Sequence, residues 1–114
     1  MSNYDTGMQA EAAALAHLQK LGFTLLAQRY RNRYGEIDLI VSRDREIRFV
    51  EVKARRSLEE GLYALKPRQQ QRMWQCAQGF LAEHLQYQDY ALQCDLIAIA
   101  GSQLEHIEHI LTSE

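Results

Sequence analysis

Two strand-like segments joined by a very short turn constrain the fold of this chain more than any other feature. Residues 36–42 alternate in polarity, and residues 47–54 are predicted to form a second strand. Arg43-Asp44-Arg45 forms a tight connection between them, so we expect an antiparallel hairpin. With Asp44 and Arg45 as a two-residue turn, residues whose numbers sum to 89 lie opposite each other.

This register gathers charged side chains on one patch of the sheet. It places Asp38 opposite Glu51 and Glu36 opposite Lys53, and Lys53 shares a face with Glu51. Ile37, Leu39 and Val41 are then expected to share the other face. A register shifted by two residues keeps the charged patch, whereas a shift by one destroys it.

The patch predicts a metal-dependent phosphodiesterase site of Asp38, Glu51 and Lys53. Facing carboxylates repel, and Mg²⁺ relieves that repulsion because it prefers oxygen ligands. A bound metal can activate water and a phosphate, while a lysine stabilises the developing negative charge. The alternative is an ordinary ladder of surface ion pairs, which contribute little to stability.

The remaining segments complete one mixed α/β domain, expected to span residues 1–114. We expect helices at residues 4–21 and 67–85, and further strands at 23–30, 91–100 and 104–111. Residues 55–64 are polar and are expected to form a mobile loop. The resulting order, α-β-β-β-α-β-β, predicts a mixed sheet with flanking helices.

The first helix carries an acid on its apolar side. Its expected core stripe is Met8, Ala12, Leu15 and Leu18, and Glu11 falls on the same stripe. An ionised carboxylate facing a core is costly unless something pairs with it. Glu11 is therefore interpreted either as a partner in a boundary salt bridge or as a functional residue.

Charge is distributed unevenly along the chain. Residues 29–72 hold twelve of the thirteen Lys and Arg and seven of the fifteen acids, a net charge of +5 against −7 elsewhere. Such asymmetry indicates a polyanionic partner such as nucleic acid, or else a solvated basic face. The predicted nucleic-acid contacts are Arg29, Arg31, Arg33, Arg55, Arg56 and Arg68, with Gln69 and Gln70 at the start of the second helix.

The same composition indicates a cytoplasmic protein with no membrane partner. No stretch approaches the ~18 consecutive apolar residues of a transmembrane helix, and residues 1–11 do not form a secretory signal. Cys76 and Cys94 are isolated, as reduced cytosolic thiols usually are. His106 and His109 lie three apart in a predicted strand, which does not favour a metal pair.

Three motifs occur in order along the chain: G-x-x-A-E at residues 7–11, R-x-x-x-G-E-I-D-L-I at 31–40 and F-V-E-V-K-x-R at 49–55. Together they resemble the YraN-like family of small bacterial proteins. That family is similar to archaeal Holliday-junction resolvases and other restriction-endonuclease-like nucleases. The chain departs from the family pattern at Gln69, usually a lysine, and at Gln93-Cys94, usually Arg-Phe.

The resemblance implies a restriction-endonuclease-like fold and assigns roles to the predicted residues. Asp38, Glu51 and the carbonyl of Val52 would bind Mg²⁺ or Mn²⁺. Lys53 would be the catalytic lysine, and Glu11 would approach the metal from the first helix. A homodimer is expected by analogy only, because a resolvase cuts two strands symmetrically.

Three hypotheses follow from these observations. The first is a metal-dependent nuclease acting on DNA, including branched or structured DNA. The second is a non-catalytic nucleic-acid-binding module that retains the nuclease fold. The third is a partner-binding protein in which the acidic cluster is structural, so that Asp38→Asn lowers stability in the absence of metal.

Overall fold

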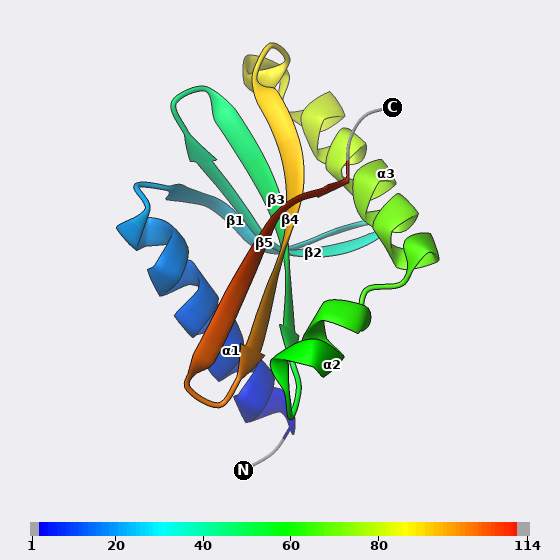
Figure 1. The fold of residues 1–114 in the computed structure, drawn as a ribbon. Helices are drawn as coiled ribbons and strands as arrows, with labels where there is room; N and C mark the ends of the chain where they lie inside the picture. The colour runs from blue at the N-terminus through cyan, green and yellow to red at the C-terminus, as the bar shows by residue number, and fades with distance from the viewer. Residues whose placement is uncertain (1–2, 112–114) are drawn as a thin grey trace.

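The computed structural model describes residues 3–111, with side chains from residue 6 to residue 110. Five strands form one sheet in the order β1-β2-β3-β4-β5, flanked by helices (Figure 1). The elements are α1 Asn3–Lys20, β1 Thr24–Asn32, β2 Gly35–Arg43, β3 Glu46–Ala54, α2 Leu58–Tyr63, α3 Pro67–Glu83, the 3₁₀ helix η1 Leu85–Tyr87, β4 Ala91–Ala100 and β5 Gln103–Leu111. Strands β3 and β4 run parallel and the other neighbours antiparallel, so the predicted mixed α/β fold is confirmed.

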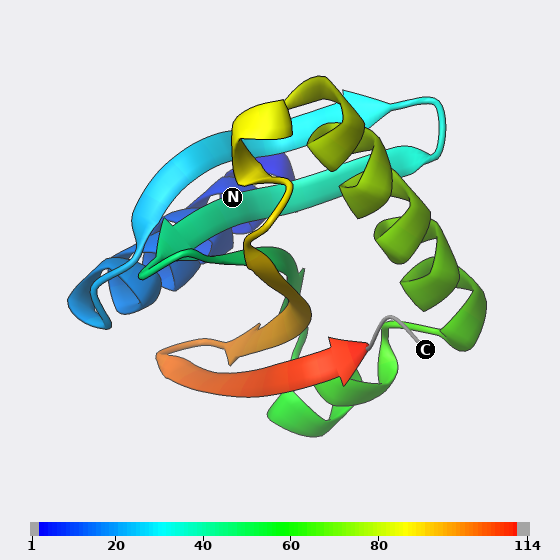
Figure 2. The ribbon, with the colours of Figure 1, turned by 90° about the horizontal axis from the view of Figure 1, so that it is seen from above.

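Two cores lie on opposite faces of the twisted sheet, one under α1 and one under α3 (Figure 2). The core under α1 includes Leu18 and Val50, and the core under α3 includes Phe49 and Phe80. Because successive side chains of a strand point to opposite faces, β3 supplies both cores alternately. Among residues 3–111, no helix combines the length and the apolar composition that a membrane crossing requires.

The β2–β3 hairpin has the predicted register. Asp44 and Arg45 have φ angles of 51° and 62°, as a two-residue hairpin turn requires. The pairs run from Arg43 with Glu46 to Leu39 with Val50. The ladder between these strands ends at the Leu39–Val50 pair, so the next residues along are released from regular pairing.

The predicted division of faces along β2 is wrong on one side of Asp38. Leu39 packs in the core under α1, but Ile37 packs beside Ile40 in the core under α3. Strict alternation would place Ile37 and Leu39 on one face, so the alternation of side chains along β2 is interrupted at Asp38. This position lies next to a distortion of β1. There Arg29 has a φ of 50°, between the residues that pair with Ile37 and Leu39. The side chain of Asp38 therefore packs in neither of the two hydrophobic cores.

The segment predicted as a mobile loop instead contains helix α2. The Ser57 side chain caps it by accepting a hydrogen bond from the Glu60 backbone N–H at 3.2 Å. Gly61 lies so close to β4 that a Cβ there would be 2.8 Å from the Cβ of Ala98. This helix is short, and its contact with the sheet determines its position.

The predicted core stripe of α1 is partly wrong. Ala10 and Ala14 are buried beside Leu18, whereas Ala12 is exposed. An alanine-rich helix offers little contrast between its faces, because an alanine buries only a single methyl group. Glu11 lies at the edge of the buried side, where it is half-buried.

Candidate metal and nucleic-acid site

Asp38, Glu51 and Lys53 converge where the β2–β3 ladder ends. Asp38 Oδ2 accepts a hydrogen bond of 2.7 Å from the backbone N–H of Val52. Lys53 Nζ lies 3.2 Å from Glu51 Oε2, and their side chains are 15% and 19% exposed. The three predicted side chains therefore come together, although the sheet ladder does not pair Asp38 with Glu51. The predicted single face is wrong, because Asp38 lines a hollow on the α1 side of the sheet and Glu51 lines one on the α3 side.

The carboxyl group of Asp38 is held where its charged form is unfavourable. Burial raises its pKa most, and the charge of Glu51 and a hydrogen bond with it raise the pKa further. The Val52 N–H and the charge of Lys53 act in the opposite direction, and the net pKa of Asp38 is about 7. One lysine does not offset the repulsion within this acidic pair, so a second positive charge would stabilise it.

Glu11 adds a third carboxylate beside the pair. Its side chain is 14% exposed, and Arg29 Nε lies 3.7 Å from its Oε1 atom. Burial raises the pKa of Glu11 first and the charge of Asp38 raises it next, while Arg29 lowers it. Within the described part of the chain, Glu11 Oε1 is buried and has no hydrogen-bond partner. An orphaned carboxylate oxygen is a suitable position for a cation or for an ordered water.

These residues fit a hard divalent cation held by few protein ligands. No group of three or more His, Cys, Asp or Glu side chains within residues 3–111 is arranged to hold a metal. Asp38 and Glu51 thus form the pair, and Glu11 lies beside it. Mg²⁺ commonly binds through one or two carboxylates together with waters and phosphate oxygens. Asp38, Glu51 and the Val52 carbonyl are the residues that would hold such an ion.

Two hollows flank the acidic pair, one on each side of the sheet. The α1-side hollow, of about 330 Å³, is lined by Thr6, Gly7, Ala10, Glu11, Asp38, Val52, Ala54 and Arg55. The α3-side hollow, of about 190 Å³, is lined by Tyr34, Gly35, Glu36, Glu51, Leu65, Gln69, Arg72 and Met73. Solvent can therefore reach the carboxylates from both faces.

The three arginines predicted on β1 and its turn lie on the α3-side approach or beside Glu11. Arg31 is exposed and pairs with Glu36 at 2.9 Å. The predicted pairing of Glu36 opposite Lys53 is wrong, because the β2–β3 ladder ends before it reaches these residues. The guanidinium of Arg33 lies 4.8 Å from the centre of the Tyr34 ring. Arg29 faces Glu11, which leaves Arg31 and Arg33 better placed for phosphate contacts.

The predicted contacts after β3 divide into two groups. Arg55 lines the α1-side hollow, while Arg56 and Arg68 are exposed on the surface. Gln69 lines the α3-side hollow, where its side chain also caps α3 by accepting the Lys66 N–H. Gln70 lines neither hollow, and its side chain donates to the Leu65 carbonyl at 3.2 Å.

Arg72 is the residue that sequence reasoning leaves out of the predicted site. It lines the α3-side hollow and also the adjoining hollow around Arg31 and Tyr34. The sequence does contain an indication of this role. Arg72 follows Gln69 by three residues in the predicted helix, so the two side chains lie on the same face of it.

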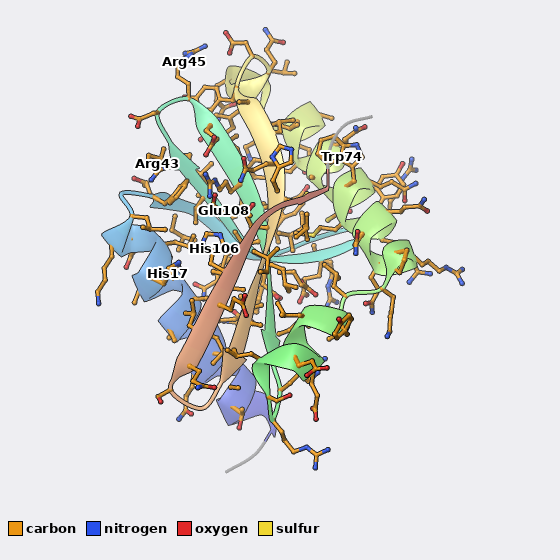
Figure 3. All side chains as sticks on the ribbon, viewed as in Figure 1. His17, Arg43, Arg45, Trp74, His106 and Glu108 are labelled. Atoms are coloured by element: carbon orange, nitrogen blue, oxygen red, sulfur yellow. The ribbon has the colours of Figure 1, made fainter. Side chains whose placement is uncertain are left out.

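A second ionic cluster lies away from this site, between α1 and strands β3 to β5. Asp95 is fully buried, with His106 Nε2 at 2.8 Å and Arg48 Nη1 at 3.1 Å from its Oδ2 atom. The other ring nitrogen of His106 lies 3.0 Å from His17 Nε2 on α1 (Figure 3). Gln93, one of the departures from the family pattern, also donates to Asp95 at 2.9 Å. These partners link elements together and leave the carboxylate of Asp95 satisfied.

Comparison with known proteins identifies the family. The model of the uncharacterised protein family UPF0102 matches residues 10–99, which include Glu11 and the whole acidic cluster. The chain belongs to the UPF0102 family. This membership agrees with the resemblance to the YraN-like family, and the matched range includes every residue that lines the α3-side hollow.

Individual relatives support the same assignment. A UPF0102 protein of Bradyrhizobium diazoefficiens is 44% identical over 110 residues, covering 96% of this chain and 81% of the relative. A UPF0102 protein of Rhodopseudomonas palustris is 45% identical over 101 residues, covering 89% and 75%. One of Nitrobacter winogradskyi is 41% identical over 101 residues, covering 89% and 86%.

Proposed function

We propose that this protein is a divalent-metal-dependent endonuclease that cleaves DNA phosphodiester bonds, including those of branched or structured DNA. The observation that carries the proposal is the half-buried Asp38–Glu51 pair at the end of a strand ladder. The pKa of Asp38 is raised to about 7 there, and Lys53 lies against Glu51. Perturbed carboxylates in an accessible hollow are characteristic of functional sites.

Each residue of the cluster has a distinct role in this proposal. Asp38 and Glu51 would hold Mg²⁺ or Mn²⁺, which supplies an activated water and polarises the phosphate. Lys53 places its ammonium group beside the reacting phosphate, where it stabilises the charge that develops on the oxygens. Glu11, with one orphaned oxygen, accepts a proton or a hydrogen bond from a water at the α1 side.

The surrounding cations orient the nucleic acid. Arg55 lies on the α1 side of the pair, and Arg72 with Arg31 on the α3 side. The acidic pair lies between the two hollows, so cations flank it on both sides of the sheet. Phosphate contacts of this kind position a substrate without selecting its sequence.

Cleavage assays test the proposal directly. Purified protein is incubated with junction, flap, single-stranded and linear DNA in Mg²⁺, Mn²⁺ or EDTA. We expect cleavage with either metal, none in EDTA, and a loss of at least ~100-fold in Lys53→Ala. Lys66→Ala, which removes an exposed lysine outside the acidic cluster, is the matched control and should cleave normally. Cleavage that persists unchanged in Lys53→Ala indicates a contaminating nuclease and overturns the assignment.

One observation favours a second candidate, a nucleic-acid-binding module without catalysis. Although Glu11 lies beside the acidic pair, no group of three or more His, Cys, Asp or Glu side chains among the described residues is arranged to hold a metal. Under this alternative the protein binds DNA in a salt-sensitive way, Lys53→Ala still binds, and no substrate is cut with either metal.

A further inference from the structure

A larger hollow continues from the α1-side hollow toward the β4–β5 turn. It has a volume of about 510 Å³ and is lined by Thr6, Gln9, Ala10, Ala13, Ala54, Arg55, Arg56, Glu60, Ile99 and Gly101. We call it the apolar hollow. Thr6, Ala10, Ala54 and Arg55 line both hollows, so the two form one continuous groove that leads from Asp38.

The lining of the apolar hollow suits a flat ring with polar edges. Ala10 and Ile99 are buried and, with Ala13 and Ala54, form an apolar surface. Arg55 and Arg56 stand at the exposed rim, and Gln9 and Glu60 offer hydrogen-bonding groups there. Guanidinium planes stack on nucleobases, and the volume lies within the range of sites for small ligands.

We propose that the apolar hollow receives one unpaired nucleobase of the strand whose phosphate lies at Asp38 and Glu51. This inference rests on the proposed function, and it names the substrate class as DNA with a locally unpaired nucleotide. The continuity of the groove carries it, because Arg55 lines both the hollow beside the acidic pair and the hollow that takes the base.

The hollow excludes a base that remains in a duplex. A paired base has both faces covered by stacking and its edge occupied by its partner. To enter a hollow bounded by α1, the end of β3 and the β4–β5 turn, it must leave the stack. An unpaired or mismatched base leaves at lower cost, so the hollow selects for gaps, flaps and junction points over intact duplex.

Filling the hollow tests the inference. Ala13 is an exposed residue of α1 that lines it, so Ala13→Leu adds bulk there without burying it in the core. Ala12→Leu makes the same change at the neighbouring exposed residue, which lines neither hollow, and is the matched control. Thermal melting and circular dichroism establish that both variants fold as the parent does.

The measurement is fluorescence anisotropy in Ca²⁺ with two labelled duplexes. Each carries one unpaired position, which is a thymine in one duplex and an abasic residue in the other. Base stacking contributes about 1–3 kcal/mol per base, so we expect the parent protein to prefer the thymine duplex about tenfold. Ala13→Leu should reduce the ratio to about one, and Ala12→Leu should keep it.

Failure of this inference is distinguishable from failure of the proposed function. A parent ratio of one, or a preference that survives Ala13→Leu, overturns the base-receiving hollow even if the protein cleaves DNA. Absence of binding to either duplex overturns it as well. A preference that Ala13→Leu abolishes while no substrate is cut supports the hollow and argues against the nuclease.

Discussion

The carboxyl group of Asp38 occupies a place that weakens the fold in the absence of a ligand. Its pKa is about 7, because burial and Glu51 outweigh Val52 and Lys53, whereas its ordinary value is 3.8. An acid with a raised pKa binds its proton more tightly in the folded chain than in the unfolded chain. The free energy of unfolding therefore falls as the pH rises from about 4 to about 7. Destabilising arrangements of this kind are typical of functional sites.

Removing that charge should stabilise the protein. In EDTA at pH 8, we expect Asp38→Asn to raise the free energy of unfolding by roughly 1–3 kcal/mol, because asparagine can still accept the Val52 N–H without carrying a charge. At pH 5 the gain should be smaller, since the folded parent is then protonated. Urea denaturation at the two pH values measures both differences.

The control for this prediction is Glu36→Gln, which breaks the exposed pair with Arg31. Such a pair contributes about 0–1 kcal/mol, and so little change is expected at either pH. A loss of stability in Asp38→Asn at pH 8 would favour the hypothesis that the acidic cluster is structural.

Arg72 is expected to contact one phosphate. Each neutralised phosphate contributes about 0.9 to the slope of log affinity against log salt concentration for duplex DNA. Arg72→Gln should therefore lower the slope by about that amount and weaken binding to all sequences equally. Titration at several salt concentrations measures the slope.

Arg45 supplies the matched control for Arg72. It lies at the tip of the β2–β3 hairpin and pairs with Asp89 at 2.7 Å (Figure 3). Arg45→Gln removes the same charge outside both hollows, so its slope should equal that of the parent. Equal decreases in the two variants would mean that the salt dependence reports net charge and no specific contact.

At the scale of elements, Asp95 connects β4 to β3 through Arg48 and to β5 through His106 and His109. Burial acts to raise its pKa, but hydrogen bonds from His106, the His109 N–H and Gln93, with the charge of Arg48, lower it overall. A lowered pKa means that the stabilisation is present above the unfolded value of about 4 and is lost as the pH falls through the folded value. The network therefore stabilises the protein at neutral pH.

Asp95→Asn should destabilise the protein by about 1.5–3 kcal/mol at pH 7, because it removes the buried charged partner of Arg48, which keeps only the more exposed Glu46 and Glu108. The difference from the parent should shrink as the pH falls below about 4. Urea denaturation of both proteins between pH 7 and pH 3.5 measures this difference in the free energy of unfolding. Asp89→Asn removes an exposed acid and is the control, with an expected change of about 0–1 kcal/mol. A constant difference across this pH range would contradict the assignment.

At the scale of the whole molecule, local chemistry made some of the fold predictable. The register of the hairpin follows from the turn at Asp44 and Arg45, and both adopt the required positive φ. The interrupted alternation at Asp38 does not follow, because it depends on the distorted backbone of Arg29 in the neighbouring strand. Helix α2 is likewise determined by its contact with Ala98, which lies far away in the sequence.

The candidate site shows the same division. Two acids and a lysine on one hairpin could be placed together from spacing alone, because the side chains of a strand alternate. The hollows could not be predicted from spacing. Each is lined by residues of α1, α3 or the β4–β5 turn, which are brought together only when these elements pack on the sheet. The proposed substrate class therefore depends on tertiary structure, whereas the proposed chemistry depends on local sequence.

Binding of a divalent cation should stabilise the entire fold. An ion that binds only the folded chain adds about 1.4 kcal/mol to the free energy of unfolding at ten times its Kd, or roughly 5 °C in Tm for a chain of this size. We expect Mg²⁺ and Mn²⁺ to raise the Tm of the parent and of Asp89→Asn at pH 8. Neither ion should raise that of Asp38→Asn or Glu51→Gln.

The pH dependence of this metal effect identifies the ligands. At pH 5 the carboxyl of Asp38, with its pKa of about 7, is protonated in the folded chain, and a cation must displace that proton to bind. The shift in Tm should therefore be smaller at pH 5 than at pH 8. Differential scanning fluorimetry across this range measures it. A shift that is independent of pH, or that survives Asp38→Asn, would mean that the ion binds elsewhere and that the acidic pair does not hold the metal.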